Sequence, residues 1–235
     1  MELGQPLHAF DADKLEGNLE VRFAKEKEKI TLLDENQLKL NKECLVIADQ
    51  KKPVALAGIM GGLATGISNK SQSIYLESAF FTPSAIRGRA RKFSIQTDAS
   101  TRFERGVDFD LQVLAIKRAS ALINETLGCE FSPIQEFLRK SSIPKNKNII
   151  LNTSNINKIL GTDLNKSVVR KSLRSLGLLN SVPNRDILKV QVPSWRFDLK
   201  IEADLIEEVA RLSLIHISEP TRPLYISYAV FCLKK

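Results

Sequence analysis

The residues most suited to chemistry begin with Glu77, a carboxylate inside an otherwise apolar run. It lies in "GIMGGLATGISNKSQSIYLESAFF", residues 58–81, where glycine pairs precede a segment typical of a buried strand. A glutamate in such a run usually belongs to an edge strand and faces solvent, because buried carboxylates are uncommon. The alternative is a buried carboxylate that accepts a hydrogen bond for a functional purpose. The residues alone leave both interpretations open.

His8, in "QPLHAFD", is the candidate for moving a proton near neutral pH. The ordinary pKa of an imidazole lies close enough to pH 7 for this role. A lone histidine shortly after a proline is more often a loop residue whose ring is satisfied by the backbone. We therefore expect a loop at this position and keep both roles for His8.

A third candidate is the acidic segment of "PSWRFDLKIEADLIEEVAR". In a helix from Ile201, apolar positions 201, 205 and 209 form one stripe, while Asp204, Glu207 and Glu208 project together on another side. Like charges this close repel each other. Three arrangements would compensate them: an arginine from a partner, a solvated face with no partner, or a hard divalent ion bound at octahedral geometry.

The first part of the chain is predicted to supply a sheet that positions these residues. Short β-rich runs separated by polar turns indicate strands of an antiparallel or mixed sheet. They are "LEVRFA", "KITLL", "LKL" and "CLVIAD", with "DENQ" as the hairpin turn. "PVALAGIMGG" and "SIYLESAFF" are more continuously apolar, which is typical of strands covered on both faces.

A helix is predicted over "DFDLQVLAIKRASALINETLG", residues 108–128, with an Asp cap before it and Gly128 after it. Its expected inward stripe comprises Leu111, Leu114, Ala115, Leu122 and Ile123. The sheet and this helix together close a first domain near Glu136.

The segment "RKSSIPKNKN", residues 139–148, has the composition of a linker. After it, "NTSNINKILG" predicts a short helix capped by Thr153 or Asn152 and ended by Gly161. "NKSVVRKSLRSLG" predicts a second helix, with Val169, Leu173 and Leu176 inward and Gly177 at its end. "ILKVQV" alternates like a strand and is followed by the acidic helix. This order predicts a small winged-helix-like module, and the fold class is α+β.

Charge and cysteine content narrow the class of protein. The 235 residues carry a formal net charge of +8, which favours an anionic partner, nucleic acid first. Cys44, Cys129 and Cys232 have neither metal-ligand spacing nor a disulfide framework, which indicates a reducing compartment, the cytoplasm by default. No apolar stretch of membrane-spanning length and no signal peptide is recognised in the sequence.

The final stretch is "LSLIHISEPTRPLYISYAVFCLKK". It follows the acidic helix without the capping or turn residues that usually end a helix. It resembles a translated sequencing adapter, and we expect residues 212–235 to be a non-native tail. The tail holds three basic residues and one acidic residue, so excluding it lowers the net charge from +8 to +6. His8 is then the only histidine, and the exact junction stays open.

Five motifs, in order and spacing, resemble the beta subunit of bacterial phenylalanyl-tRNA synthetase. They are "ELGQPLHAFDADKLEG", "AGIMGG", "LESAFF", "RGRARKFSIQTDASTRFERGVD" and "PSWRFDLKIEADLIEEVAR". The resemblance covers residues 1 to about 211. It implies an N-terminally truncated editing domain over 1–138, the linker over 139–148, and a C-terminally truncated winged-helix-like domain over 149–211.

The resemblance implies a function for the first domain. The parent enzyme would attach phenylalanine to tRNA(Phe) using ATP and Mg²⁺, as an alpha2beta2 complex with the alpha subunit, and this region would hydrolyse mischarged Tyr-tRNA(Phe). The apolar pocket that activates phenylalanine rejects tyrosine, which has one added hydroxyl, only about 100-fold. A second site that hydrolyses the mischarged product is therefore needed. This chain alone is expected to lack synthetic activity.

The family pattern also assigns site residues. Glu77 would accept the phenol hydroxyl of tyrosine, and Gly61 would form part of the tyrosine-binding wall. Pro6 and His8 would lie beside the scissile ester, where His8 orients or activates water. Thr97 would hold the aminoacyl group or water, and Ala99 would keep the pocket open. No nucleophile is needed, because an aminoacyl ester is already activated.

The resemblance also implies a metal site, and the basic residues themselves suggest a surface for tRNA. Magnesium would be held by Asp198, Asp204, Glu207 and Glu208, near the alpha-subunit interface. "RGRARK", residues 87–92, would guide the end of tRNA through phosphate contacts or would simply be a solvated face. The alternative to an enzyme is a non-catalytic nucleic-acid-binding or scaffolding module. An enzyme requires His8 and Glu77 to face one cavity, whereas a scaffold does not.

Overall fold

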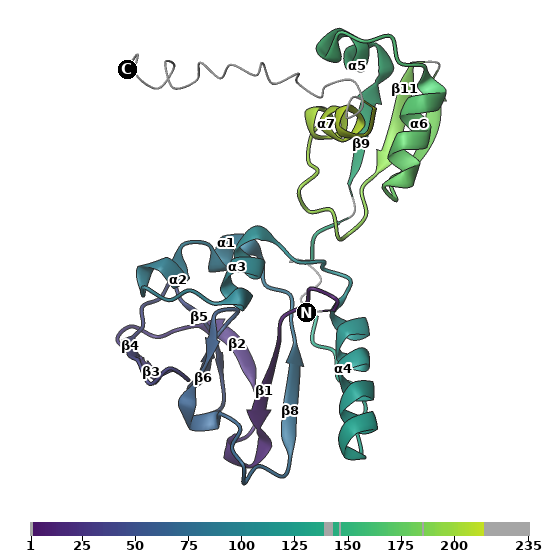
Figure 1. Cartoon of the computed structure of the whole chain (residues 1–235). Helices are drawn as coiled ribbons and strands as arrows, with labels where there is room; N and C mark the ends of the chain where they lie inside the picture. Colours follow the sequence, from purple (N-terminus) through teal and green to yellow (C-terminus); the bar gives the residue numbers. More distant parts are fainter. Residues whose placement is uncertain (1, 139–142, 146, 185, 214–235) are drawn as a thin grey trace, which may run out of the picture. The chain divides into compact units, whose positions relative to one another are not determined.

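The computed structural model describes residues 2–138, 143–145, 147–184 and 186–213. The chain divides into two compact units, Met1–Pro144 and Lys145–Lys235 (Figure 1). Both units combine helices with antiparallel strands, so the predicted α+β class is confirmed. The domain limits proposed from the sequence stay a prediction, and nearly all of the expected tail, from residue 214 onward, lies outside the described residues.

Three small sheets build the first unit. A four-stranded antiparallel sheet has the order β2-β5-β6-β7, β3 pairs with β4, and β1 pairs with β8. The strands are β1 (Leu7–Asp11), β2 (Glu20–Phe23), β3 (Lys29–Thr31), β4 (Gln37–Lys39), β5 (Leu45–Ala48), β6 (Pro53–Leu56), β7 (Met60–Gly61) and β8 (Ile74–Ser78). The predicted strands over residues 19–49 and the hairpin turn at "DENQ" are confirmed.

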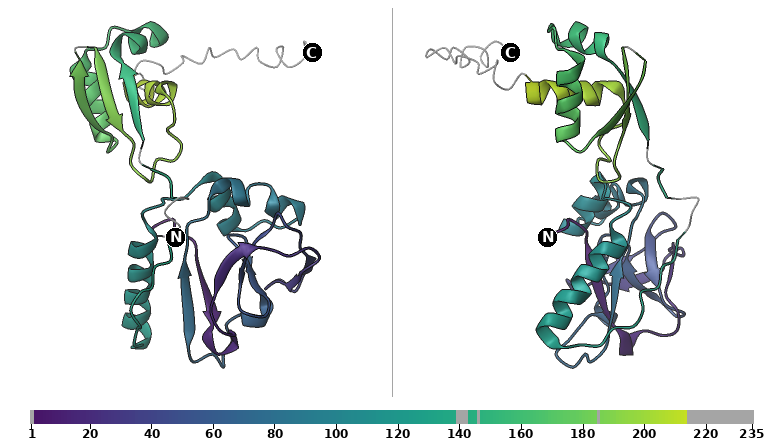
Figure 2. Two further views of the ribbon diagram at one scale, coloured as in Figure 1. Left: turned by 180° about the vertical axis from the view of Figure 1, so that it is seen from behind. Right: turned by 90° about the vertical axis from the view of Figure 1, so that its right-hand side faces the viewer.

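Helices follow these strands and cover them. They are the 3-10 turns η1 (Ala12–Lys14) and η2 (Leu63–Thr65) and the helices α1 (Pro83–Ile86), α2 (Arg89–Lys92), α3 (Asp98–Arg105) and α4 (Gln112–Leu127). Figures 1 and 2 show α4 alongside β8, and the Ser78 hydroxyl donates to the Gln112 carbonyl over 2.9 Å. Gly128 ends α4 in the left-handed conformation, as predicted.

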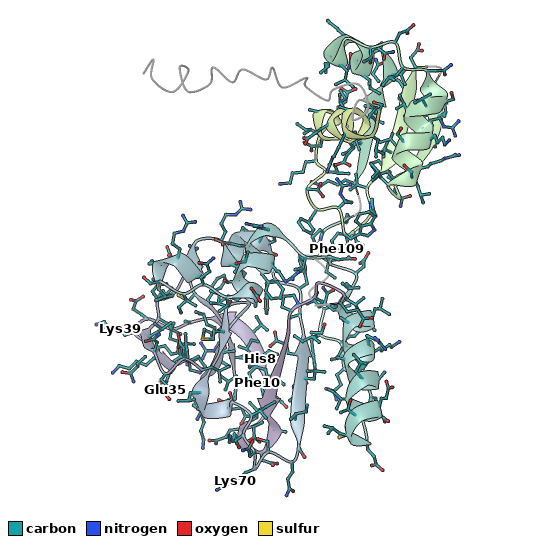
Figure 3. All side chains as sticks on the ribbon, viewed as in Figure 1. His8, Phe10, Glu35, Lys39, Lys70 and Phe109 are labelled. Carbon is teal, nitrogen blue, oxygen red and sulfur yellow. The ribbon has the colours of Figure 1, made fainter. Side chains whose placement is uncertain are left out.

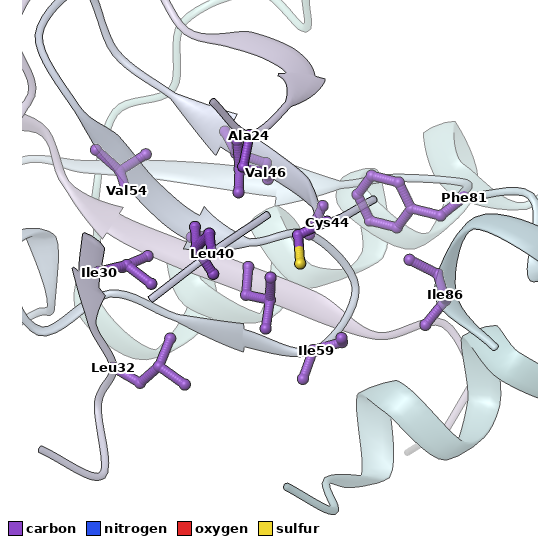
Figure 4. Packing of buried hydrophobic residues seen from close by; sticks show 14 of the residues in the cluster. Ala24, Ile30, Leu32, Leu40, Cys44, Val46, Val54, Ile59, Phe81 and Ile86 are labelled. Carbon is purple, nitrogen blue, oxygen red and sulfur yellow. The ribbon is translucent and has the colours of Figure 1, made fainter. Parts of the chain in front are cut away.

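The core of the first unit lies between the sheets and the short helices. Figure 4 shows apolar side chains from several strands meeting those of the helical segment. Its members include Leu32, Leu40, Val46, Phe81 and Ile86, each at most 5% exposed. β6 is buried along its whole length, as its continuous apolar sequence predicts. The core fixes the sheet on which the candidate site is built.

Four expectations for the first unit were wrong. No Asp side chain caps α4, whose N-cap residue is Leu111. "QPLHAFD" is not a loop, because residues 7–11 form β1 and pair with β8. β8 is not covered on both faces, since Ile74 and Tyr75 are exposed. In the predicted stripe of α4 only Ala115 is buried, while Leu114 and Leu122 face solvent. α4 packs against β8 and not across the main core, so most of its apolar face stays uncovered.

The second unit contains β9 (Asn148–Asn152), α5 (Thr153–Leu160), α6 (Lys166–Ser175), β10 (Leu179–Asn184), β11 (Ile187–Gln191) and α7 (Glu202–Ser213). Its sheet has three antiparallel strands in the order β10-β11-β9, whereas the sequence analysis expected one strand. The strand that was predicted, β11, is the central one. The winged-helix description stays a prediction.

The two predicted helices of this unit are confirmed. The Asn152 side chain accepts from the Ser154 N–H and caps α5, and Gly161 ends that helix at φ +64°. Val169 and Leu173 of α6 are buried as predicted, and Leu176 packs against the same core. Cys44 and Cys129 are free thiols, and no helix among the described residues is long and apolar enough to cross a membrane.

Candidate functional site

His8 and Glu77 lie directly opposite each other on the paired strands β1 and β8. Directly opposed residues of an antiparallel pair project from the same face, so the two side chains are neighbours. Figure 3 shows His8 and Phe10 on β1, and their rings meet edge to face with centroids 4.5 Å apart. The pairing that the sequence analysis missed is what brings the two candidate groups together.

A cavity of about 60 Å³ opens beside these two side chains. It is lined by Pro6, Leu7, His8, Ile47, Ala55, Leu56, Gly58, Ile59, Met60, Gly61, Glu77, Phe81 and Phe103. Four of the six residues expected in the substrate site, Pro6, His8, Gly61 and Glu77, are therefore in its wall. A cavity of this size holds a few water molecules and is too small for a tyrosine side chain.

The His8 ring itself occupies the space above Gly61. A Cβ built on Gly61 would collide with the Cε1 and Nε2 atoms of that ring. Glycine at this position therefore lets the imidazole approach the backbone closely. Movement of the ring away from Gly61 would enlarge the cavity.

Gly58 closes the other end of the cavity. Its φ is +69°, and an added Cβ would meet Phe81, Ile86 and Phe103 at 3.0–3.1 Å. The Phe81 and Phe103 rings stack edge to face with centroids 5.1 Å apart. Both the backbone conformation and the lack of space require glycine here, so the apolar end wall is well defined.

Burial favours the uncharged form of both polar groups. Burial raises the pKa of the Glu77 carboxyl to about 7, and burial lowers the pKa of the His8 imidazole below its ordinary value. The His8 Nε2 atom is buried and has no hydrogen-bond partner among the described residues. An unpaired buried nitrogen beside a carboxyl that titrates near neutrality is typical of functional sites.

Thr97 and Ala99 are not in the cavity wall. The Thr97 hydroxyl donates to the Ile59 carbonyl over 2.8 Å and accepts from the Ser100 N–H, which caps α3. Ala99 packs against the core of the first unit. Thr97 thus contacts Ile59, which does line the cavity, and the assignment of Thr97 to substrate stays a prediction.

Gln5 and Gln112, which the sequence did not single out, hold the segment that leads from Pro6 into β1. Gln5 is 8% exposed, and its amide donates to the carbonyls of Pro6 and Ala79 over 3.0 and 2.7 Å. Its side-chain oxygen accepts from Gln112 on α4 over 3.2 Å. A buried glutamine next to Pro6 fixes the start of β1, but nothing in the sequence distinguishes it from a surface glutamine.

Part of the basic segment at residues 87–92 is already engaged within the protein. Arg87 donates to the Glu104 carbonyl over 3.3 Å, and Arg89 donates to the Glu43 carbonyl over 3.2 Å. Lys92 forms an ion pair with the Glu43 carboxylate at 3.2 Å. These contacts are exposed and weak, so they are compatible with either interpretation of this surface.

The acidic residues of the second unit have different environments. Glu207 is exposed, whereas Glu208 is only 5% exposed. Asp204 accepts from the backbone N–H groups of Lys200 and Ile201, over 2.7 and 3.0 Å. The expectation of one shared acidic face was wrong, because Glu208 turns inward with the apolar side of α7.

Arginines of this chain compensate Glu208 and Asp198. Arg196 donates to Glu208 over 2.8 Å and to Asp198 over 2.7 Å, and Arg211 also pairs with Glu208. Arg196 holds the pKa of the Asp198 carboxyl below its ordinary value, chiefly by hydrogen bonding. The compensating cations are therefore arginines of the same unit, whereas the alternative stated from the sequence was an arginine from a partner.

These carboxylates do not fit a magnesium site as they stand. Among the described residues no group of three or more His, Cys, Asp or Glu side chains is placed to hold a metal ion. A hard cation needs several free carboxylate oxygens. Both oxygens of Asp198 and one oxygen each of Asp204 and Glu208 already accept hydrogen bonds.

Comparison with protein families matches both units. The model of the B3/4 domain matches residues 1–128. The model of the tRNA synthetase B5 domain matches residues 149–213.

Similar sequences bear the name phenylalanine–tRNA ligase beta subunit. The protein from Acinetobacter baylyi is 48% identical over 212 residues, which cover 90% of this chain and 27% of that protein. Those from Coxiella burnetii and Nitrosococcus oceani are 49% and 46% identical, over 90% and 95% of this chain and 27% and 28% of theirs. The chain thus spans about a quarter of the length of these relatives.

A solved structure is also similar. It is an N-terminal fragment of the phenylalanyl-tRNA synthetase beta subunit from Pyrococcus horikoshii, with a TM-score of 0.42 and 14% identity. The match covers 86% of this chain and 58% of that one.

Proposed function

The chain belongs to the B3/4 domain family and is homologous to bacterial phenylalanine–tRNA ligase beta subunits, and from this premise we propose that its first unit hydrolyses mischarged Tyr-tRNA(Phe). The observation that carries the proposal is the placement of His8 and Glu77 on opposed positions of β1 and β8, both in the wall of one cavity. A non-catalytic scaffold has no need of this arrangement.

Glu77 provides selectivity for tyrosine in this proposal. The phenol hydroxyl donates a hydrogen bond to the Glu77 carboxyl, which has no such partner when phenylalanine is bound. A buried acceptor left unpaired costs about 1–3 kcal/mol, and more when it is charged. A site built to pair with a hydroxyl rejects a substrate that lacks it far more strongly than an apolar pocket rejects an added one.

His8 positions the attacking water. Its lowered pKa keeps the imidazole neutral near pH 7, so the buried Nε2 atom is free to accept a proton from water. The water oxygen forms a bond to the ester carbonyl carbon, and the ester C–O bond breaks. Free tyrosine leaves, and the 3′ or 2′ oxygen of the tRNA takes up the proton. Positioning supplies much of the acceleration because the ester is already activated.

The substrate requires a rearrangement of His8. The cavity of about 60 Å³ admits a tyrosine ring only when the imidazole moves off Gly61. Rotation about the side-chain bonds of His8 achieves this without breaking a hydrogen bond to Nε2 among the described residues. Substrate entry and water positioning thus depend on the same side chain.

The parent enzyme in this proposal is a cytoplasmic ligase that attaches phenylalanine to tRNA(Phe) with ATP as substrate and Mg²⁺ as cofactor, in an alpha2beta2 complex. We keep magnesium binding at Asp198, Asp204, Glu207 and Glu208 as a proposal for that complex. No step of hydrolysis depends on it. For a metal to bind, Arg196 and Arg211 must first release Glu208.

The test is tyrosine release from preformed Tyr-tRNA(Phe) by the complete beta subunit carrying this sequence, assembled with the alpha subunit. Glu77→Ala should lower deacylation efficiency roughly 10- to 150-fold, the value of one charge-assisted hydrogen bond. Glu20→Ala, which changes an exposed glutamate on β2, is the matched control and should be silent. If the parent releases no tyrosine above the uncatalysed rate, the scaffolding function is the better account.

A further inference from the structure

The hydrogen bonds that join β1 to β8 follow a fixed alternation. In an antiparallel pair, positions that exchange backbone hydrogen bonds alternate with positions that do not. Just beyond the end of β1, the Ala12 N–H donates to the Ser73 carbonyl over 3.0 Å. Counting back from there by two residues at a time places the opposed His8 and Glu77 at a hydrogen-bonded position. The backbones of both candidate groups therefore belong to this ladder of hydrogen bonds.

A proline interrupts the ladder one step further along. Leu7 lies opposite Ser78, and the next residues outward are Pro6 and Ala79, which again stand at a position of the hydrogen-bonded kind. Proline has no N–H, so Pro6 cannot donate to the Ala79 carbonyl. Without a substitute donor, the pair that contains His8 would be the last hydrogen-bonded pair of the ladder.

The Gln5 side chain supplies the missing donor. Its Nε2 atom donates to the Ala79 carbonyl over 2.7 Å and to the Pro6 carbonyl over 3.0 Å. One amide group thus bridges the two backbone positions that the proline keeps from pairing fully. Gln5 is only 8% exposed, and a buried carbonyl left without a donor is costly. A side chain therefore continues the ladder by one step beyond His8.

The first residue of α4 holds the Gln5 amide in this orientation. The Gln112 Nε2 atom donates to the Gln5 side-chain oxygen over 3.2 Å and to the Asp108 carbonyl over 2.7 Å. The Gln112 carbonyl in turn accepts from the hydroxyl of Ser78, the last residue of β8, over 2.9 Å. Both hydrogens of the Gln5 amide and its oxygen are engaged. The start of α4 is thereby bonded to the ends of both strands.

We propose that Gln5 is a positioning residue for the hydrolysis, because it replaces the N–H that Pro6 lacks and so holds His8 on β1 opposite Glu77 on β8. This inference rests on the proposed function and adds a residue that acts through the strand pairing and not by contact with substrate. A displacement of about 1 Å can lower a rate about 100-fold. Glu77 and Gly61, which would recognise tyrosine, lie on other strands, so loosening β1 should affect kcat more than KM.

Steady-state hydrolysis of Tyr-tRNA(Phe) by the complete enzyme tests this inference. Gln5→Met keeps the length of the side chain but removes its amide, and it should lower kcat roughly 10- to 100-fold while KM changes less than about 3-fold. Gln112→Ala leaves the amide but removes its support, and should lower kcat less, roughly 3- to 10-fold. Gln37→Met changes an exposed glutamine on β4 and is the matched control, which should be silent.

A second substitution tests whether Gln5 acts as the substitute donor. Pro6→Ala restores an N–H at the position where the ladder lacks one. Gln5→Met should therefore lower kcat less in the Pro6→Ala background than in the parent, by a factor of at least about 3. A side chain that only fills space in the fold would show equal losses in both backgrounds, and that result would overturn the proposal.

The outcomes distinguish failure of the positioning role from failure of the proposed function. If the parent enzyme hydrolyses Tyr-tRNA(Phe) and Gln5→Met keeps the parent kcat, the positioning role is wrong and the hydrolytic function stands. A lower melting temperature with an unchanged kcat leads to the same conclusion, because Gln5 would then be purely structural. If circular dichroism shows that Gln5→Met does not fold, Gln112→Ala decides by the same criterion. If the parent enzyme does not hydrolyse Tyr-tRNA(Phe), both proposals are wrong.

Discussion

The two units of this chain treat their buried ionisable groups in opposite ways. In the first unit, His8 Nε2 is buried and has no hydrogen-bond partner among the residues that the structure describes, and burial raises the pKa of the Glu77 carboxyl opposite it to about 7. In the second unit, the buried Glu208 is paired with both Arg196 and Arg211. Removing one partner of a buried ion pair is costly because the other charge is left uncompensated, whereas a buried polar group without a partner is available to a ligand. This difference supports the proposal that the hydrolytic site lies in the first unit.

The largest expected effect comes from filling the cavity. Gly61→Trp should lower tyrosine release from Tyr-tRNA(Phe) by at least about 100-fold, because the indole would occupy the space of both substrate and His8. Gly61→Ala should produce a smaller loss, since its Cβ only displaces the His8 ring. The measurement is deacylation by the complete enzyme, with circular dichroism as a check of folding. If both variants hydrolysed Tyr-tRNA(Phe) at the parent rate, this cavity would not be the hydrolytic site.

A second prediction separates the roles of the two groups. His8→Ala should slow hydrolysis of Tyr-tRNA(Phe) roughly 10- to 100-fold, in keeping with loss of acid–base assistance, while preference over Phe-tRNA(Phe) is largely kept. Glu77→Ala should instead reduce that preference, because the phenol loses its acceptor. Rates on both charged tRNAs provide the comparison. If both variants lost the preference for Tyr-tRNA(Phe) equally, Glu77 and His8 would not have the separate roles proposed here.

The second unit offers a prediction about stability. Glu208→Gln should lower its free energy of unfolding by about 1–3 kcal/mol, because hydrogen bonds between a buried carboxylate and two arginines are weakened. Glu207→Gln, one residue earlier and exposed, is the matched control and should change it by less than about 0.5 kcal/mol. Trp195, the only tryptophan, reports this unit in urea unfolding followed by fluorescence.

Equal effects of the two substitutions would contradict the distinction between the paired and the solvated acid. Binding of Mg²⁺ to the complete enzyme, measured by calorimetry on the same variants, tests the proposed metal site. A loss of binding in Glu208→Gln would show that the arginines release this carboxylate in the assembly.

The smallest expected effect is a difference in pH dependence between the units. The pKa of Glu77 in the folded state, about 7, exceeds its ordinary 4.5, so the folded state holds the extra proton and stability falls as pH rises between these values. The pKa of Asp198 is lowered, so its contribution is present above the ordinary value of 3.8 and is lost as pH falls below it. Glu77→Gln should therefore raise the melting temperature of the first unit more at pH 8 than at pH 5.

Sequence reasoning predicted the strands and helices whose stabilising contacts are local. The caps of α5 and the end of α4 depend on residues within one turn, Asn152, Gly161 and Gly128, and these were predicted correctly. β1 was missed because "LHAFD" has no clear alternation and becomes a strand only by pairing with β8, more than sixty residues away. The stripe of α4 was misjudged because periodicity indicates an apolar face without showing what covers it.

The candidate site was predictable only in part for the same reason. Glu77 and His8 were named from their types and from the family pattern, but their opposition depends on a long-range strand register. Gln5 could not be identified, because glutamine is ordinarily a surface residue and the strand pairing that it extends is not written in local sequence. The paired state of Glu208 was likewise a tertiary effect, set by Arg196 from the segment before α7.

The central claim is that burial in the wall of one cavity raises the pKa of Glu77 and lowers the pKa of His8, and NMR titration of the two side chains tests it most directly. The Glu77 carboxyl carbon, assigned through Glu77→Gln, should titrate with a pKa of about 7, and the His8 ring should titrate below 6.5. A Glu77 pKa near its ordinary 4.5, together with a His8 pKa at or above 6.5, would show two solvated groups and would contradict the account.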